Sequence, residues 1–486
     1  MRSRLSAAAV ALSVALPAPA AEPVTSAVAF SSCQLAHPLL AIRIPARCGS
    51  LPVPENPGQR EGREIALHIA ILPAEAPRAQ PDPVFVLAGG PGQSITATYP
   101  AVAPAFERMN RDRDVVLVDQ RGTGGSGLLS CPGDGAGGRE GRRGDERRMA
   151  ADCARSIPAD LTQYGTAQFV GDLERVRAAL GYERVNLVAF SYGTRAALAY
   201  ARAYPERTRT LVLDGVAPLE MVVGATFDRD SGRALAALSE RCRSEPACRA
   251  RHPDVSGELG ALLRRLTLRP EKVRTAHPTT GEPLEVTVDA AALRQVVLGF
   301  LYQAETASLL PELLGEAERG NWAPLAAEGA LVAADIEAGL SRPVYLSVLC
   351  SEDVPFYADG AATGEIPSFL GGVVQHGLRD ACSAWPRGTV EPDLHRSAEL
   401  SVPALLVSGG ADPVTPPEWA ALAARSLPRS LSLTLAGQGH GNLGRGCVPR
   451  LAAEFVRRGT ADGLDASCVE RLRPAPVFVD LLGGAP

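Results

Sequence analysis

The sequence predicts an α/β fold in which a mostly parallel, doubly wound sheet carries a large helical insertion. Seven short apolar runs resemble buried strands, and most have apolar residues on both faces, as strands covered by helices do. Helical patterns lie between several of these runs, which indicates that strands and helices alternate. A long stretch rich in Ala and Leu breaks this alternation before the last two strands.

The expected elements follow in chain order. One helical pattern, "FVGDLERVRAALG", ends at Gly181, and another, "RAALAYARAYP", comes directly after the strand-to-helix turn at Ser191. Residues 128–165 are rich in Gly, Arg and Asp and predict an exposed loop. The strands are expected to begin at Glu64, Pro83, Asp114, Val185, Thr210, Pro403 and Ser432.

Residues 217–400 are too many for a loop and show helical spacing, as in "GRALAALSERC". We therefore expect a mainly helical cap inserted between two strands of the sheet. The expected parts are a signal peptide over 1–20, the first part of the core over 21–216, the cap over 217–400 and the C-terminal part of the core over 401–486.

The N-terminus has the layout of a secretory signal peptide. Two arginines precede an apolar run from Leu5 to Leu16, and Ala18-Pro19-Ala20 offers a small-residue cleavage site. The alternative is a buried N-terminal helix. The run is too short to span a bilayer, and no other segment is long and apolar enough. We expect an exported protein, periplasmic or extracellular, without a membrane span.

Ten cysteines fit an oxidising compartment, where they can pair. We hypothesise that neighbours pair because short loops close at the least entropic cost, although sequence alone does not fix connectivity. Zinc ligation is disfavoured because neither C-x-x-C nor H-E-x-x-H spacing occurs. The expected pairs are Cys33 with Cys48, Cys131 with Cys153, Cys242 with Cys248, Cys350 with Cys382, and Cys447 with Cys468.

Composition limits the partners that the chain can have. Hydrophobic residues make up 46% and charged residues 21%, which is typical of a globular protein. The net charge is -5 and no basic stripe occurs, so nucleic acid is not an expected partner. No metal or organic cofactor is implied, and the oligomeric state stays open.

Ser191 lies in "AFSYG", between a predicted strand and a predicted helix. A nucleophile elbow, G-x-S-x-G, places a serine on such a turn and needs small residues on both sides because the turn is crowded. Gly193 fits the pattern, and Ala189 replaces the first glycine. The helix that follows directs its N-terminal amides at the site, which favours a developing oxyanion. Ser191 is therefore a candidate nucleophile rather than a turn residue.

An acid and a base are then required in the order Ser, Asp, His. Asp412 follows a predicted strand in "LLVSGGADPVTPP", and His440 follows the last one in "LAGQGHGNLG". Strand ends at one edge of such a sheet are where sites form. Asp214 also ends a strand and remains a rival for the acid.

The stretch "LAGGPGQS" can supply an oxyanion hole. Its glycines allow backbone N–H groups to turn inward, so Gly89 and Gly90 are candidate donors together with Tyr192, the residue after the nucleophile. A phosphate cradle is the alternative, but no Gly-Lys-Ser/Thr follows. The later "GTGGSG" matches a dinucleotide motif, yet a Gly- and Arg-rich loop follows it instead of a helix, so dinucleotide binding is disfavoured.

The motifs "GGPG", "DQRGTGGSG", "FSYGT", "LVLDGV", "GGADPVTP" and "GQGHG" occur in this order. From about residue 40 to 470, the chain resembles α/β-hydrolase peptidases of the prolyl iminopeptidase group. It is most similar to secreted tripeptidyl-aminopeptidase-like hydrolases with a characteristic C-terminal region. The resemblance implies Ser191, Asp412 and His440 as the triad and Gly89, Gly90 and Tyr192 as the oxyanion hole. Ala88 and Ala189 depart from the family's usual His and Gly.

An aminopeptidase needs a carboxylate to recognise the free amino group of its substrate. "LCSEDVPF" supplies Glu352 and Asp353, and "CSAWP" supplies Trp385, so these three are candidate substrate-binding residues. The alternative is an acidic pair that caps a helix or lies in solvent. We expect an exported serine aminopeptidase, of prolyl or tripeptidyl type, that cleaves short peptides through an acyl-enzyme. An esterase or amidase of the same fold and a catalytically silent binding protein are the alternatives.

Overall fold

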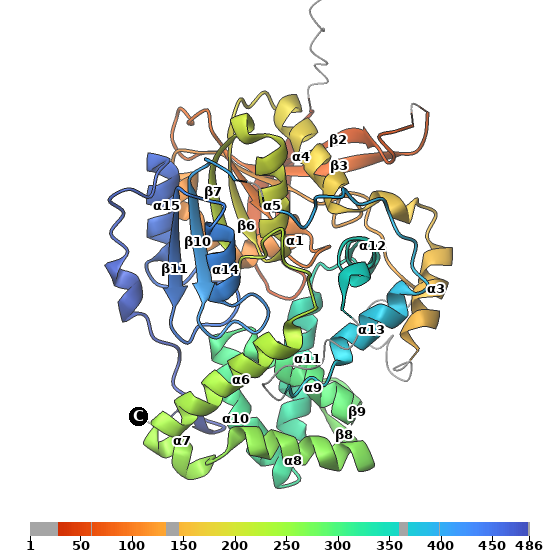
Figure 1. Cartoon of the computed structure of the whole chain (residues 1–486), viewed down its shortest axis with the longest axis vertical. Coiled ribbons are helices and arrows are strands. Elements are labelled where there is room, and N and C mark those ends of the chain that lie inside the picture. The colour runs from red at the N-terminus through yellow and green to blue at the C-terminus, as the bar shows by residue number, and fades with distance from the viewer. Residues whose placement is uncertain (1–27, 60, 133–144, 359–367, 398, 485–486) are drawn as a thin grey trace, which may run out of the picture.

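The computed structural model describes residues 28–59, 61–132, 145–358, 368–397 and 399–484. The expected signal peptide, 1–20, lies outside these residues. Nine strands form the central sheet in the order β1-β2-β3-β5-β4-β6-β7-β10-β11 (Figure 1). The first three of them pair in antiparallel fashion, and from β5 to β11 all neighbours are parallel. The strands span β1 Ser31–Ala36, β2 Arg43–Pro54, β3 Glu64–Leu72, β4 Val84–Leu87, β5 Val115–Val118, β6 Val185–Phe190, β7 Thr208–Asp214, β10 Ala404–Gly409 and β11 Ser430–Leu435.

Successive side chains of the parallel strands point alternately into two hydrophobic layers, one on each face of the sheet. On β4, Phe85 and Leu87 face one layer, while Val84 and Val86 face the other. The first layer is covered by α4 (Thr166–Ala179), α5 (Tyr192–Ala203) and α14 (Pro417–Ala424). The second is covered by α1 (Ile95–Val102), α2 (Glu107–Asn110) and α15 (Val448–Arg458). The sheet is therefore doubly wound, which confirms the predicted α/β fold.

Residues between β7 and β10 divide between two packing units. The helical lobe below the sheet in Figure 1 has its own hydrophobic cluster. By contrast, α12 (Arg342–Glu352) and α13 (Val373–Cys382) pack with the sheet layer that α5 covers. The lobe consists of α6 Phe227–Ser244, α7 Pro246–Arg251, α8 Val255–Leu268, β8 Glu271–Ala276, β9 Pro283–Val288, α9 Ala290–Leu301, α10 Ala304–Glu318 and α11 Ala323–Glu337, with β12 Phe478–Asp480 and β13 Gly483–Gly484 from the C-terminal segment.

The expectation that residues 128–165 form an exposed loop is wrong for the described part of that segment. Helix α3 spans Glu146–Ser156, is capped by Asp145, and buries Ala150 and Cys153. Cys153 is bonded to Cys131, which holds the helix against the core. The high content of charged and glycine residues concealed a short amphipathic helix.

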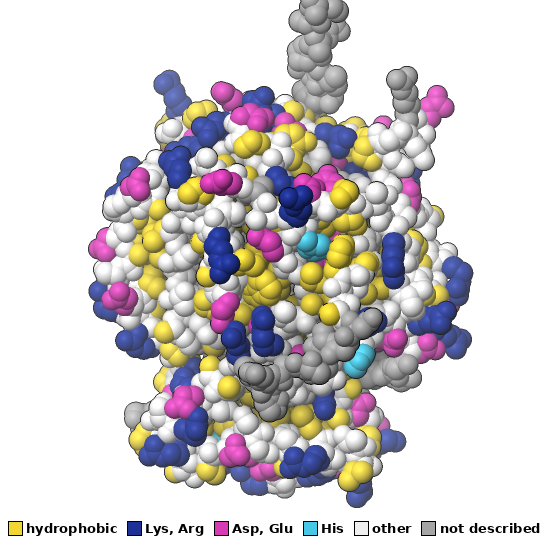
Figure 2. Space-filling view, viewed as in Figure 1, with side chains coloured by type: hydrophobic (Ala, Val, Ile, Leu, Met, Phe, Trp, Pro, Cys, Tyr) yellow, Lys and Arg dark blue, Asp and Glu magenta, His cyan; other side chains and the backbone are white. Residues whose placement is uncertain are grey.

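All five disulfides join the neighbouring cysteines of the sequence, which confirms the pairing hypothesis. Such a set is typical of proteins that fold in an oxidising compartment. Across the described residues, no helix combines the length and the apolar character needed to cross a bilayer. On the face shown in Figure 2, charged side chains are spread widely, and hydrophobic ones are most visible near the middle of the upper body.

Candidate active site

Ser191 occupies a strained turn between β6 and α5. Its backbone has φ 52° and ψ -125°, and it is the one non-glycine residue with positive φ in the described part of the chain. Such strain persists where the surrounding structure enforces it, and in hydrolases it lifts the serine hydroxyl clear of the backbone. The Ser191 N–H donates to the carbonyl of Asp214 at 2.9 Å, which ties the turn to the end of β7.

Two glycines allow the chain to approach this turn. A Cβ on Gly193 would lie 2.4 Å from the carbonyl oxygen of Ala88, and one on Gly89 would lie 2.9 Å from the Cβ of Ser191. Gly89 therefore lies against the serine, and the next residue, Gly90, has φ +104°. As the first residue of α5, Tyr192 has an N–H without an intrahelical partner. Tyr192 and Gly89 thus lie next to Ser191, and their role as oxyanion donors stays a prediction.

Asp412 and His440 meet where β10 and β11 end. The Nδ1 atom of His440 lies 2.7 Å from Oδ2 of Asp412. The hydroxyl of Thr415 contacts both residues: it donates to Asp412 Oδ2 at 2.8 Å and lies 3.0 Å from His440 Nδ1. The N–H groups of Val414 and Thr415 donate to the other oxygen of Asp412 at 2.9 and 2.8 Å. The carboxylate is therefore held rigidly beside the imidazole.

The serine and histidine turns are linked through the end of β7. Ser191 is bonded to the backbone of Asp214, and the next residue, Gly215, lies against the imidazole. A Cβ on Gly215 would lie 2.7 Å from Cε1 of His440, so a larger residue would displace the ring. The structure thus brings all three predicted triad residues to one edge of the sheet.

Asp214, the rival acid, holds the backbone that follows His440. Its Oδ2 accepts the N–H groups of Asn442 and Leu443, each at 2.6 Å, and its Oδ1 is buried without a partner among the described residues. Burial raises the pKa of Asp214 to about 6, although the two N–H donors act in the opposite direction. Its geometry fits a residue that positions the histidine loop, whereas Asp412 is bonded to the imidazole itself.

Asp412 and His440 each shift the pKa of the other so that its charged form is favoured. Burial alone would raise the pKa of Asp412, but the facing imidazole and the N–H donors hold this pKa below its ordinary value. Burial would likewise lower the pKa of His440, yet the charge of Asp412 and the hydrogen bond to it raise this pKa above the ordinary value. The pair therefore favours a protonated imidazole, as a general base needs once it has accepted a proton.

The predicted substrate carboxylate Glu352 lies inside the molecule, at the end of α12. It is 4% exposed and accepts the N–H and the hydroxyl of Thr166, both at 2.6 Å. The Thr166 hydroxyl also lies 2.7 Å from the hydroxyl of Tyr192, so Glu352 is linked to the residue after the nucleophile. Burial raises the pKa of Glu352 to about 7 against the opposing effect of the Thr166 donors.

Asp353 and Trp385 also have partners within the chain. Both oxygens of Asp353 lie 3.0 Å from Nη1 of Arg195 on α5, and both side chains are fully buried. Trp385 is 4% exposed and donates its indole N–H to the Ser347 hydroxyl at 3.1 Å. The charge of Asp353 is thus already matched, which leaves Glu352 as the acidic residue of this pair that lacks a cationic hydrogen-bond partner.

Sequence reasoning missed Asp119, which anchors the loop over Ser191. Its Oδ1 accepts the Ser94 hydroxyl at 2.8 Å and the Thr96 N–H at 3.0 Å, at the point where the glycine loop enters α1. Its Oδ2 accepts the Thr96 hydroxyl at 2.6 Å and the N–H of Gly125 at 3.0 Å. The signal was its position directly after a buried strand. Among the described residues, no group of three His, Cys, Asp or Glu side chains could hold a metal ion.

Comparison with known proteins gives two family matches. The model of the alpha/beta hydrolase fold family matches residues 82–276, and that of the TAP-like proteins matches residues 368–468. The first match contains Ser191, and the second contains Asp412 and His440. The two matches follow each other along the chain as the core and C-terminal parts do.

Curated relatives point in the same direction. The serine protease Hip1 of Mycobacterium tuberculosis is 25% identical, and the alignment covers 91% of each chain. The tripeptidyl aminopeptidase of Streptomyces lividans is 26% identical over 35% of each chain. The proline iminopeptidase of Xylella fastidiosa is 33% identical over 28% of this chain and 32% of its own. The chain is therefore a serine hydrolase with the α/β-hydrolase fold, related to peptidases of the prolyl-iminopeptidase and tripeptidyl-aminopeptidase kinds.

Proposed function

We propose that the protein is an exported serine aminopeptidase that cleaves short peptides near a free N-terminus, with Ser191, His440 and Asp412 as its triad. The observation that carries the proposal is the 2.7 Å contact between His440 and Asp412 beside the strained turn of Ser191. The related peptidases support peptides as substrates, and the five disulfides support export.

In the proposed reaction, the hydroxyl of Ser191 attacks the scissile carbonyl while Nε2 of His440 takes its proton. The N–H groups of Tyr192 and of the Gly89-Gly90 segment donate hydrogen bonds to the carbonyl oxygen and stabilise the negative charge that develops on it. The imidazolium then gives its proton to the departing amine, which leaves an acyl-enzyme. Water, deprotonated by the same histidine, hydrolyses the ester and restores the serine.

Recognition of the substrate amine is assigned to Glu352 rather than to Asp353. Arg195 already neutralises Asp353, whereas the hydrogen-bond donors to Glu352 are uncharged. An ammonium group near Glu352 would favour its ionised form, and hydrogen bonds through Thr166 connect this carboxylate to the hydroxyl of Tyr192, the residue after the proposed nucleophile. The helical lobe of α6 to α11 is proposed to restrict access to short chains, and Trp385 to support the wall formed by α12.

A library of short peptides with free and N-acetylated termini tests the activity. We expect cleavage of the free peptides and poor cleavage of the acetylated ones, with Ser191→Ala as the inactive control. A fluorophosphonate probe should label the wild type and fail to label Ser191→Ala. Rapid turnover of small esters without any cleavage of peptides would replace this proposal with the esterase alternative.

The role of Glu352 is tested by the same pairs of substrates on Glu352→Gln. We expect the preference for a free amine to fall while the fluorophosphonate still labels Ser191, because the triad is untouched. Asp353→Asn serves as a contrast, since it leaves Arg195 buried without a counter-charge and should lower the melting temperature instead. An unchanged preference in Glu352→Gln would remove this residue from the substrate site.

A further inference from the structure

A cavity of about 400 Å³ lies between the helical lobe and the end of the sheet, and its lining residues do not include Ser191, Asp412 or His440. Small apolar side chains of α6 and α10 form much of its wall, and the loop that leads to His440 closes another side. Among its lining residues are Ala234, Leu238, Ala304 and Ala307 from the lobe and Gly437 and Gly439 from the loop. The volume falls in the range of small-ligand pockets and corresponds to roughly a dozen water-sized groups.

The cavity is also lined by a guanidinium group with two nitrogen atoms that lack a hydrogen-bond partner among the described residues. Arg241 lines it near the C-terminal end of α6, and its Nε and Nη2 atoms are buried without a hydrogen bond to any described residue. Its carboxylate neighbour, Glu245, lies 3.9 Å from Nε, beyond hydrogen-bond distance. Burial lowers the pKa of Arg241 below its ordinary value, and Glu245 compensates in part. Buried donors of this kind are costly unless an acceptor reaches them.

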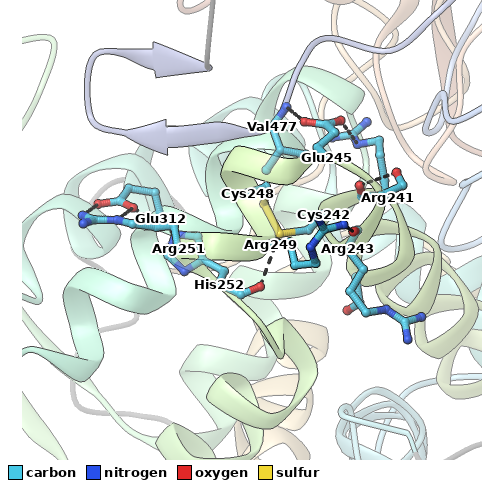
Figure 3. The surroundings of a disulfide bond; sticks show 12 residues. Arg241, Cys242, Arg243, Glu245, Cys248, Arg249, Arg251, His252, Glu312 and Val477 are labelled. Atoms are coloured by element: carbon cyan, nitrogen blue, oxygen red, sulfur yellow. Dashed lines mark hydrogen bonds and ion pairs between the residues drawn. A yellow bond between two sulfur atoms is a disulfide. The ribbon is translucent and has the colours of Figure 1, made fainter.

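A disulfide bond fixes the backbone next to Arg241, and the two nearby glutamates have other hydrogen-bond or ion-pair partners. The buried disulfide between Cys242 and Cys248 fixes the corner from α6 to α7 directly after Arg241 (Figure 3). Glu245 accepts the N–H of Val477 at 3.2 Å through Oε2, and Figure 3 shows it on the same side of the disulfide as Arg241. Glu240, which also lines the cavity, forms an exposed ion pair with Arg243. Within the described part of the chain, no carboxylate therefore forms a hydrogen bond with Nε or Nη2 of Arg241.

One wall of the cavity is part of the support of the catalytic loop. The N–H of His440 donates to the carbonyl of Tyr302 at 2.6 Å, and the Gln303 amide donates to the carbonyl of His440 at 2.9 Å. Tyr302 and Gln303 join α9 to α10, and the residues on either side of them, Leu301 and Ala304, line the cavity. An occupant would thus contact the segment that holds the backbone of His440.

We propose that this cavity binds a small amphipathic carboxylate, with its anionic group on Arg241 and its apolar tail among the alanine and leucine side chains of α6 and α10. A guanidinium matches a carboxylate in geometry and charge, and the apolar wall matches an aliphatic tail. Two sources have this chemistry, a medium-chain fatty acid and the C-terminus of an apolar peptide. The site does not depend on the proposed peptidase activity.

Calorimetric titration of the Ser191→Ala protein tests the proposal without any turnover. Octanoate represents the fatty acid, and N-acetyl-leucyl-leucine represents the peptide C-terminus; the tighter binder identifies the source. Arg241→Leu should weaken binding roughly ten- to a hundredfold, because it removes charge-assisted hydrogen bonds. Arg243→Leu, on the same helix but exposed, is the matched control and should leave the affinity unchanged.

A second variant separates binding from folding. Ala237 is exposed on α6 and lines the cavity, so Ala237→Trp should fill it and block octanoate while the melting temperature stays near that of the parent. Octanol, which has the same tail without the charge, should bind more weakly than octanoate. Equal affinity of octanoate for the parent and for Arg241→Leu, or no binding of either acid at roughly millimolar concentration, would overturn the proposal.

Discussion

At the residue scale, the two acids near His440 have different geometries and should respond differently to the same substitution. Asp412→Asn presents an amide to Nδ1 and favours the wrong imidazole tautomer, so kcat should fall on the order of 10⁴-fold. Asp214→Asn keeps an oxygen that can accept from Asn442 or Leu443 and should cost far less activity. Steady-state kinetics on both variants, with circular dichroism as a check on folding, distinguishes the two. A larger loss in Asp214→Asn would assign the acid to that residue.

With His440 as the proposed general base, its raised pKa should set the acidic limb of activity. Only the neutral imidazole can accept the proton of Ser191, so kcat/KM should fall as pH drops through this pKa. Because Asp412 raises it, the limb should lie above the ordinary histidine value of about 6.5. The residual activity of Asp412→Asn should show a limb at lower pH. A limb in the wild type well below the ordinary value would contradict the electrostatic account of the pair.

Glu352 should make stability depend on pH. Its pKa of about 7 in the folded protein exceeds that of the unfolded chain, so the folded state retains a proton that the unfolded state has lost. Stability should therefore fall as pH rises from about 4.3 to 7, on the order of 3 kcal/mol for this group. Glu352→Gln should flatten the profile in denaturant titrations, and the exposed Glu206→Gln should not. The opposite slope, with stability rising over this range, would exclude a buried neutral Glu352.

Residue order and strand ends led to the prediction of Ser191, Asp412 and His440, because parallel strands bring their ends to one edge; the assignment of the triad stays a prediction. The same pattern could not reveal Thr415, whose hydroxyl contacts both Asp412 and His440. It also could not reveal that Arg195 neutralises Asp353, since the two are separated by more than 150 residues and meet only through packing.

At the element scale, all seven predicted strands exist, since buried parallel strands leave continuous apolar runs. The antiparallel pair β1 and β2 was not predicted, because exposed and buried positions alternate in it and arginines and prolines interrupt its apolar pattern. The hairpin of β8 and β9 was also not predicted, because its positions alternate between exposed and partly buried. Helix α3 was hidden by its charged surface. Elements at the edges of the fold therefore carry the weakest sequence signals.

The approach of α5 to the glycine loop predicts a strong effect for one methyl group. In Gly193→Ala the new Cβ would lie 2.4 Å from the backbone oxygen of Ala88, so α5 or the loop must shift. We expect a loss of about 1–3 kcal/mol in stability and on the order of a hundredfold in kcat/KM. Gly171→Ala in α4 is the control, because its Cβ would meet only the flexible Arg175 side chain, at 3.3 Å. It should be neutral or stabilising. Full activity in Gly193→Ala would contradict this prediction, because it would show that the glycine loop can shift to accommodate the methyl group without loss of function.

At the scale of the whole molecule, the disulfides reinforce local units rather than join distant ones. Cys350–Cys382 closes 32 residues and links α12 to α13, whereas Cys242–Cys248 closes only 6. Removing the longer link by paired Ala substitution should cost about 3–4 kcal/mol of unfolding free energy, against about 2 kcal/mol for the shorter one. Chemical denaturation of the two double variants measures the difference. Equal losses would indicate that loop length does not set the contribution of these links.

In the proposed mechanism, the order of these elements along the chain would determine when hydrolysis can start. Ser191 belongs to the first half of the polypeptide, whereas Asp412 and His440 belong to its last hundred residues. Under that mechanism, a chain synthesised only as far as the helical lobe would carry Ser191 without its proposed proton acceptor, and an unassisted serine hydroxyl is a weak nucleophile. The proposed activity would therefore appear only after β10 and β11 have joined the sheet.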